Sequence, residues 1–102
     1  MNEGRLTDQL ATQVLGWRPS SDRYLKPGRG WIPRWRFRPL QELTDAFRLL
    51  DTGVQQYTLT RDSRGFSAEV QIGSRRGSAS GINKARTITL AVARALGLEA
   101  DK

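Results

Sequence analysis

The segment Phe66–Ile72 constrains the fold most, because its residues alternate strictly between apolar and polar side chains. Successive side chains of a β-strand point to opposite faces of the sheet, so this period of two predicts a strand with one buried and one solvated face. The preceding segment Val54–Arg61 is rich in aromatic and β-branched residues, and the turn-forming stretch Asp62–Gly65 separates the two. Together they predict a β-hairpin, which we place at the centre of an antiparallel sheet.

Three other segments have the apolar spacing of amphipathic helices. Apolar residues recur every three or four positions in Arg5–Leu15, Pro39–Leu50 and Ala85–Leu96. Gly16 and Gly97 follow the first and third segments and suit a left-handed helix end. The second segment opens with a proline, which is favoured at the first helical position.

Two segments leave alternatives open. Trp31–Arg38 alternates in part and is either a short edge strand or a loop; as a strand, it would place Arg34, Arg36 and Arg38 on one side and the rings of Trp35 and Phe37 on the inner side. The small-residue stretch Gly77–Gly81 is either a third strand or a loop.

The order of these elements predicts the fold class. A chain of 102 residues is long enough for one domain, so we expect residues 1–102 to form a single α/β (α+β) domain. We expect a small antiparallel sheet of two to four strands sandwiched by helices, with helices on both of its faces. Residues 18–38 are interpreted as a basic loop or edge-strand insert, and residues 99–102 as a frayed tail.

Positive charge is concentrated in two parts of the chain. The net charge of +7 divides into +6 for residues 17–39, +4 for residues 73–86 and −3 for the remainder. Such asymmetry favours an anionic partner more than a uniformly high isoelectric point would. Nucleic acid is the favoured partner and an acidic host protein is the alternative, whereas the sequence leaves the oligomeric state open.

Aromatic residues are interleaved with the arginines, because five of the eight aromatics lie in the more basic of these two parts. Arginine binds phosphate through two parallel hydrogen bonds, and aromatic faces stack on unpaired bases. The candidate nucleic-acid-binding or anion-binding residues are Arg29, Arg34, Arg36, Arg38, Arg75, Arg76, Lys84, Arg86 and Trp31. We expect the first four to share one exposed face that Arg75 and Arg76 extend.

Each of these features also has a purely structural interpretation. The arginines can form a solvated face whose stems cover core aromatics, and we favour the core for Trp17 and Trp35. The interpretations of Trp31, in a predicted loop, are evenly balanced. The stretch Gly73–Gly81 could hold an anion ahead of the last helix, but a basic hairpin tip is favoured.

The sequence argues against an enzyme. Cysteine and histidine are both absent, which excludes Cys/His zinc sites and imidazole acid–base catalysis. The carboxylates have no metal-binding spacing, and Asp45 and Asp51 are interpreted as a solvated helix face. We therefore expect no catalytic residue, no metal and no cofactor. No apolar run approaches the roughly 20 residues that span a bilayer and no signal peptide is visible, so we expect a cytoplasmic protein with no membrane partner.

Four short motifs stand out along the chain: Val14-Leu15-Gly16-Trp17, Trp31-Ile32-Pro33, Thr44-Asp45-Ala46-Phe47-Arg48-Leu49-Leu50 and the alanine-rich Thr89–Leu96. Together they resemble the phage ABA-sandwich domain family of small prophage-encoded proteins. Phe47 departs from the tryptophan common there, and residues 19–30 have no clear counterpart. The resemblance implies the fold and a bacterial host cell, and it assigns no activity.

A second resemblance covers Leu40–Leu98. Helix, three strands and helix is also the order of a double-stranded-RNA-binding domain, whose closing helix begins with a basic motif similar to Asn83-Lys84-Ala85-Arg86. The two resemblances and the charge lead to one functional hypothesis, a non-enzymatic phage or prophage accessory protein that binds nucleic acid through a basic surface. The alternative hypothesis is a protein-interaction factor, anti-host or anti-defence, that does not bind nucleic acid.

Overall fold

The computed structural model describes residues 3–98, so the predicted tail at 99–102 lies outside the described residues. The helices are α1 (Glu3–Leu10), the π-helix η1 (Ala11–Leu15), the 3₁₀-helix η2 (Arg34–Arg36), α2 (Leu43–Gly53) and α3 (Lys84–Ala95). The strands are β1 (Arg18–Pro19), β2 (Arg23–Leu25), β3 (Trp31–Pro33), β4 (Gln56–Asp62), β5 (Gly65–Ile72) and β6 (Arg75–Gly81). They form two antiparallel sheets, a small one with the order β1-β2-β3 and a large one with the order β4-β5-β6.

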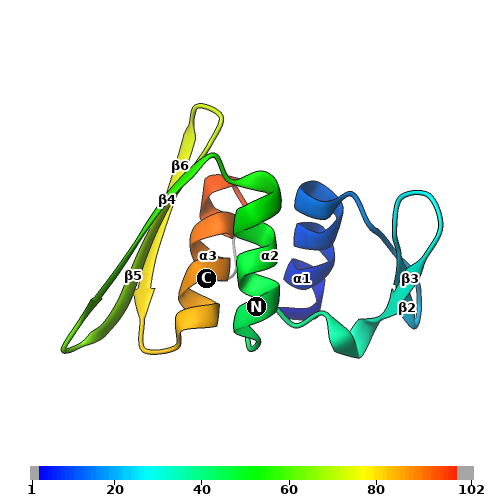
Figure 1. Cartoon of the computed structure of the whole chain (residues 1–102), viewed down its shortest axis with the longest axis horizontal. Helices are drawn as coiled ribbons and strands as arrows, with labels where there is room; N and C mark the ends of the chain where they lie inside the picture. The colour runs from blue at the N-terminus through cyan, green and yellow to red at the C-terminus, as the bar shows by residue number, and fades with distance from the viewer. Residues whose placement is uncertain (1–2, 99–102) are drawn as a thin grey trace.

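The helices form a layer between the two sheets (Figure 1). The large sheet lies at one end of the 41 Å long axis, α3 and α2 come next, then α1, and the small sheet lies at the other end. The α+β sandwich class is therefore confirmed. The expectation of helices on both faces of one sheet is corrected, because the outer face of the large sheet is exposed to solvent.

The large sheet contains the predicted hairpin. Strands β4 and β5 pair in continuous register from Gln56↔Gln71 to Asp62↔Gly65, and β6 pairs with the other side of β5. The stretch Gly77–Gly81 is thus a strand, which resolves one of the open alternatives. It makes β5 the central strand and leaves β4 at an edge.

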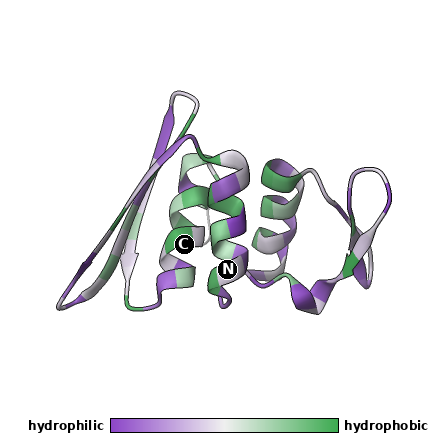
Figure 2. Ribbon diagram, viewed as in Figure 1, coloured by the Kyte–Doolittle hydropathy of each residue, from purple (hydrophilic) through white to green (hydrophobic). Residues whose placement is uncertain are grey.

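Small residues on the inner face of β6 let α3 pack directly on the strand. A Cβ atom added at Gly77 would collide with the backbone of Ala91 and Ala95. Glycine at this position therefore permits the close approach of helix and sheet. The alanines of α3, the buried Ala68 and Val70 of β5 and the apolar residues of α2 complete the core (Figure 2).

The first and third helices agree with the predictions. Residues 3–15 are helical throughout, and Gly16 ends η1 in the left-handed conformation with φ = 74°. The third helix begins at Lys84, where the Asn83 side chain accepts a hydrogen bond from the amide of Arg86 at 2.9 Å.

The second helix begins at Leu43, four residues after Pro39, which the sequence predicts as its first residue. The Asp45 carboxylate accepts a hydrogen bond from the Arg38 amide at 2.9 Å, and the Thr89 hydroxyl donates to the Pro39 carbonyl at 2.7 Å. These bonds hold residues 38–40 in a turn that precedes the helix. Asp45 is consequently buried, so its interpretation as part of a solvated face is wrong.

Three aromatic rings join the small sheet to the helices. Trp17, Tyr24 and Phe37 are buried, with ring centroids 5.1 to 5.9 Å apart. The core positions expected for Trp17 and Phe37 are confirmed. The one expected for Trp35 is wrong, because 71% of its surface is exposed. The chain leaves β3 at Pro33 and makes a 3₁₀ turn, so the alternation predicted for residues 34–38 is lost.

Candidate nucleic-acid interface

The outer face of the small sheet carries an exposed indole beside basic side chains. The strand register places Arg18, Leu25 and Trp31 in one row across the three strands. Tyr24, which precedes Leu25 in β2, points to the opposite face of the sheet, where it is buried. Trp31 is 53% exposed and Leu25 is 37% exposed.

An arginine holds the indole of Trp31 in place. The Arg23 guanidinium lies 4.2 Å from the centroid of the Trp31 ring, and its Nε donates to the Asp22 carboxylate at 3.0 Å. This hydrogen bond lowers the pKa of Asp22, so the carboxylate is ionised near neutral pH. Because this contact already orders the indole, stacking of a second planar group on it costs little conformational entropy.

A shallow hollow lies beside Trp31, at the loop end of the β2–β3 hairpin. It is lined by Gly16, Arg18, Leu25, Lys26, Pro27, Gly28, Gly30 and Trp31. The Lys26 amide donates to the Gly30 carbonyl at 3.0 Å, which closes the hairpin loop, and all five residues of this loop are exposed. We call Arg18, Arg23, Leu25, Lys26, Arg29 and Trp31 the Trp31 face.

A second exposed indole follows in η2. The guanidinium of Arg36 lies 5.8 Å from the Trp35 ring. Among the described residues, the side chains of Arg18, Lys26, Arg29, Arg36 and Arg38 are exposed and make no ion pair. Arg18, Lys26, Arg29 and Arg36 can therefore interact with a ligand without breaking a salt bridge, whereas Arg38 lies beside the start of α2, where its amide donates to Asp45.

Arg34 has a different environment from the other predicted arginines. Its two terminal nitrogens donate to both Asp8 oxygens at 2.7 and 2.9 Å, and its Nε donates to the Ser20 carbonyl at 2.7 Å. The Tyr24 hydroxyl donates to the same carboxylate at 2.7 Å. Arg34 therefore links the small sheet to α1. It does not share an exposed face with Arg29, Arg36 and Arg38, so the prediction of such a face is wrong.

The polar network around Asp8 shifts its ionisation. Partial burial opposes ionisation of Asp8, but hydrogen bonds from Arg34 and Tyr24 and the charge of Arg34 outweigh it, so its pKa is lowered. Burial, and then the neighbouring Asp8 carboxylate, raise the pKa of Tyr24 above its usual value. The ionic pair and the neutral phenol are therefore the forms present at neutral pH.

The remaining predicted residues lie away from the Trp31 face. Arg75 and Arg76 begin β6 in the large sheet, at the opposite end of the long axis, so they do not extend it (Figure 1). They follow the Gly73–Ser74 turn as exposed side chains, in agreement with a basic hairpin tip. Lys84 lies 5.8 and 5.7 Å from the Phe47 and Phe66 rings.

Arg86, the other basic residue at the start of α3, donates to the Glu3 carboxylate at 2.7 Å. It is thus part of an ion pair between α3 and α1. The interaction is intramolecular, as it is for Arg34.

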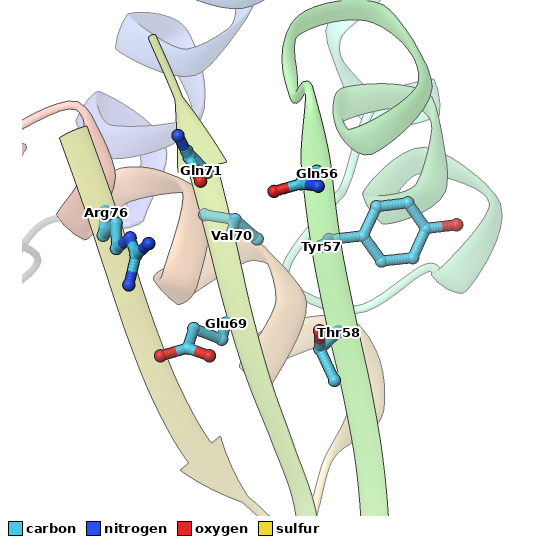
Figure 3. A pocket seen from close by; sticks show the side chains of 7 residues that line it. All are labelled: Gln56, Tyr57, Thr58, Glu69, Val70, Gln71 and Arg76. Atoms are coloured by element: carbon cyan, nitrogen blue, oxygen red, sulfur yellow. The ribbon is translucent and has the colours of Figure 1, made fainter. Parts of the chain in front are cut away.

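The open face of the large sheet has a second shallow hollow. Gln56, Tyr57, Thr58, Glu69, Val70, Gln71 and Arg76 line it (Figure 3). The side chains on this face are short or polar, and the Tyr57 ring projects beyond β4 on the side away from β5. This hollow therefore lacks a stacking surface of the kind that Trp31 provides.

The described part of the chain contains no group of three or more metal-ligating side chains. Within the same residues, no helix is long and apolar enough to cross a bilayer.

Comparison with known proteins establishes the fold. No protein-family profile matches the sequence, and no curated protein matches it. A solved structure, the 2.0 Å crystal structure of a phage protein from Bacillus cereus ATCC 14579, is similar with a TM-score of 0.76 and 14% sequence identity. The similarity covers 99% of this chain and 93% of that one. The two proteins therefore share their fold along almost the whole chain.

Proposed function

We propose that the chain is a phage or prophage accessory protein of the ABA-sandwich family that binds single-stranded nucleic acid in the host cytoplasm, without catalysing a reaction. The fold shared with a phage protein supports the phage setting. One observation supports the ligand above all. The exposed ring of Trp31 lies on an outer sheet face beside Arg23, which is paired with Asp22. The nearby basic residues Arg18, Lys26 and Arg29 are exposed and have no ion-pair partner among the described residues.

Single-stranded nucleic acid fits this chemistry better than a duplex. An unpaired base presents a flat face that can stack on Trp31, whereas the bases of a duplex are already stacked on one another. The neighbouring phosphates can then bind Arg18, Lys26 and Arg29. Trp35 and Arg36 provide a second stacking ring and cation farther along the chain.

The alternative function is binding of an acidic protein surface by the same residues. Exposed tryptophan and arginine are also enriched at protein–protein interfaces, so composition alone does not distinguish the two ligands. The salt dependence of binding distinguishes them. Binding of a single strand through about four phosphates gives a slope of roughly −3 in a plot of log K against log salt concentration.

The test uses two double variants that remove the same charge. Arg18→Ala with Arg29→Ala changes the Trp31 face, and Arg64→Ala with Arg76→Ala removes two exposed arginines at the large-sheet end. Fluorescence anisotropy with a labelled 15-nucleotide single strand should show at least tenfold weaker binding for the first variant and a salt slope smaller in magnitude by about 1.4. The second variant should bind like the parent.

Trp31→Ala tests the stacking. We expect it to weaken binding at least fivefold without changing the salt slope, because an indole carries no charge. Equal losses in the two double variants, or no binding by the parent at low salt, would contradict the proposal. Recovery of a host protein from lysate after nuclease treatment would then support the alternative.

A further inference from the structure

The two edges of the large sheet differ in how they are protected. Along β6, α3 packs against the strand, and the Arg94 guanidinium donates to the Ser78 carbonyl at 2.8 Å. Along β4 the helices make few contacts, and six of its seven residues are exposed, with Leu59 partly buried. The backbone groups on the outer side of β4 therefore face solvent.

Strand β4 also lacks most of the features that usually prevent edge-to-edge pairing, and its charged residues, Arg61 and Asp62, are confined to its last two positions. It contains no proline or glycine, and its seven-residue register with β5 is continuous. Natural edge strands are typically short, bulged, charged, interrupted by proline or covered. Tyr57 is 44% exposed and its ring projects past the free edge (Figure 3). An uncovered, regular edge with an exposed aromatic ring is a surface suited to another strand.

We infer that β4 pairs with β4 of a second copy of this chain, antiparallel and in full register about Leu59. This inference goes beyond the proposed function and does not depend on it. In this register Leu59 lies opposite Leu59, Tyr57 opposite Arg61, and Gln56 opposite Asp62 of the second copy.

The sequence of β4 is self-complementary in this arrangement. No two like charges lie opposite each other. Arg61, whose guanidinium lies 6.0 Å from the Phe66 ring of its own chain, is placed opposite Tyr57 of the other copy, and the symmetry produces this pair twice. The threonines at 58 and 60 also lie opposite each other. A second copy thus satisfies both the free backbone groups and the side chains of the edge.

The pairing has a defined geometry. An antiparallel pair of identical strands is related by a twofold axis perpendicular to the sheet, so the dimer has a continuous six-stranded sheet with the helices of both copies on one face. The small sheets lie beyond the helices, on the same side (Figure 1). Both Trp31 faces therefore lie on one side of the dimer.

The first measurement is the mass in solution. A single pair of edge strands buries little surface, at or below the roughly 1,200 Å² at the low end of specific interfaces, so the dimer should be reversible. Sedimentation velocity between 5 and 500 µM should show the mass rising from 11.5 kDa toward twice that value. A monomer at every concentration would overturn the inference.

A charge exchange tests the register. Tyr57→Arg places two arginines opposite each other at both ends of the pair and should weaken the dimer at least tenfold. Adding Arg61→Glu to this variant restores opposite charges and should recover most of the loss. Ser78→Arg, which adds the same charge on the exposed face of β6, is the matched control and should dimerise like the parent.

Hydrogen exchange identifies the strand that pairs. Amides of β4 should exchange at least tenfold more slowly at 500 µM than at 5 µM, and those of β6 should not change. Circular dichroism shows whether each variant is folded. Loss of the dimer in Ser78→Arg, no recovery in the double variant, or protection of β6 would overturn the inference.

Discussion

The two ends of the molecule are held together by different interactions. At the large-sheet end, small aliphatic residues pack closely, and α3 contacts β6 where Gly77 leaves room for the helix backbone. At the small-sheet end, three rings and the ionic network of Asp8, Tyr24 and Arg34 attach strands of two or three residues to α1.

This difference affects where function can be located. The large-sheet end uses its apolar residues for the core and presents mainly polar side chains on its open face. The small-sheet end needs few residues for its attachment. Trp31, Trp35 and most of the basic side chains there remain on the surface, available to a ligand.

The largest expected effect is the difference in stability between removing a buried and an exposed aromatic ring at the small-sheet end. Phe37→Ala removes a fully buried ring from the three-ring cluster and should lower the free energy of unfolding by about 3–5 kcal/mol. Trp35→Ala should change it by less than about 0.5 kcal/mol, because this ring is exposed. Urea unfolding measures both values, and similar losses for the two variants would contradict the contrast.

The close packing at the other end is tested by Gly77→Ala. The added methyl group would meet the backbone of α3, and overpacking of this kind should cost about 1–3 kcal/mol. Ser80→Ala, on the exposed face of the same strand, is the control and should be nearly neutral. A Gly77→Ala protein as stable as the parent in thermal unfolding would show that the helix can move away.

Removal of Arg34 should affect the small-sheet end alone. Arg34→Ala leaves Asp8 without its bidentate partner and should cost about 1–2 kcal/mol, a value reduced by the partial exposure of both side chains. Hydrogen exchange should increase in residues 18–33 and remain unchanged in β5. Arg36→Ala, whose guanidinium makes no ion pair with a described residue, should leave exchange in residues 18–33 as in the parent.

The smallest expected effect is a pH dependence of this attachment. The pKa of Asp8 is lowered, so its stabilisation is complete above the unfolded value near 3.8 and is lost as the pH falls through the lower folded pKa. The pKa of Tyr24 is raised, so its stabilisation is complete below the unfolded value near 10.0 and is lost as the pH rises through the higher folded pKa. Melting temperatures of Asp8→Asn should fall less steeply in acid than those of the parent, and Tyr24→Phe should show less loss in alkali.

The hairpin and the helices of the large-sheet end can be predicted from the sequence, whereas strand β6 stays an open alternative and the small sheet is not predicted. Periodicity identifies Phe66–Ile72 and the three helices, because each of these segments is long enough to repeat its pattern. The small sheet has strands of two or three residues, which are too short to show a period. A 3₁₀ turn then breaks the apparent alternation of residues 34–38.

The predicted exposure of the candidate residues agrees with the structure where it follows from local sequence. Arg29 and Trp31 lie in or beside a glycine-containing loop and are exposed, as expected of a binding surface. The environment of Arg34 depends on Asp8, 26 residues away, which no local pattern reveals. Arg18, Arg23 and Lys26 are not among the residues predicted from local patterns, although they lie in the same basic segment.

The wide turn at Ala11–Leu15 determines how the small sheet is oriented. Both the Gly16 and Trp17 amides donate to the Ala11 carbonyl, so this turn holds more residues than an α-helical turn would. One residue corresponds to about 100° of rotation about a helix axis. A relative that lacked one residue here would turn its tryptophan away from the aromatic cluster and attach the small sheet in another direction. The length of this turn therefore sets the direction in which the basic end projects from the sandwich.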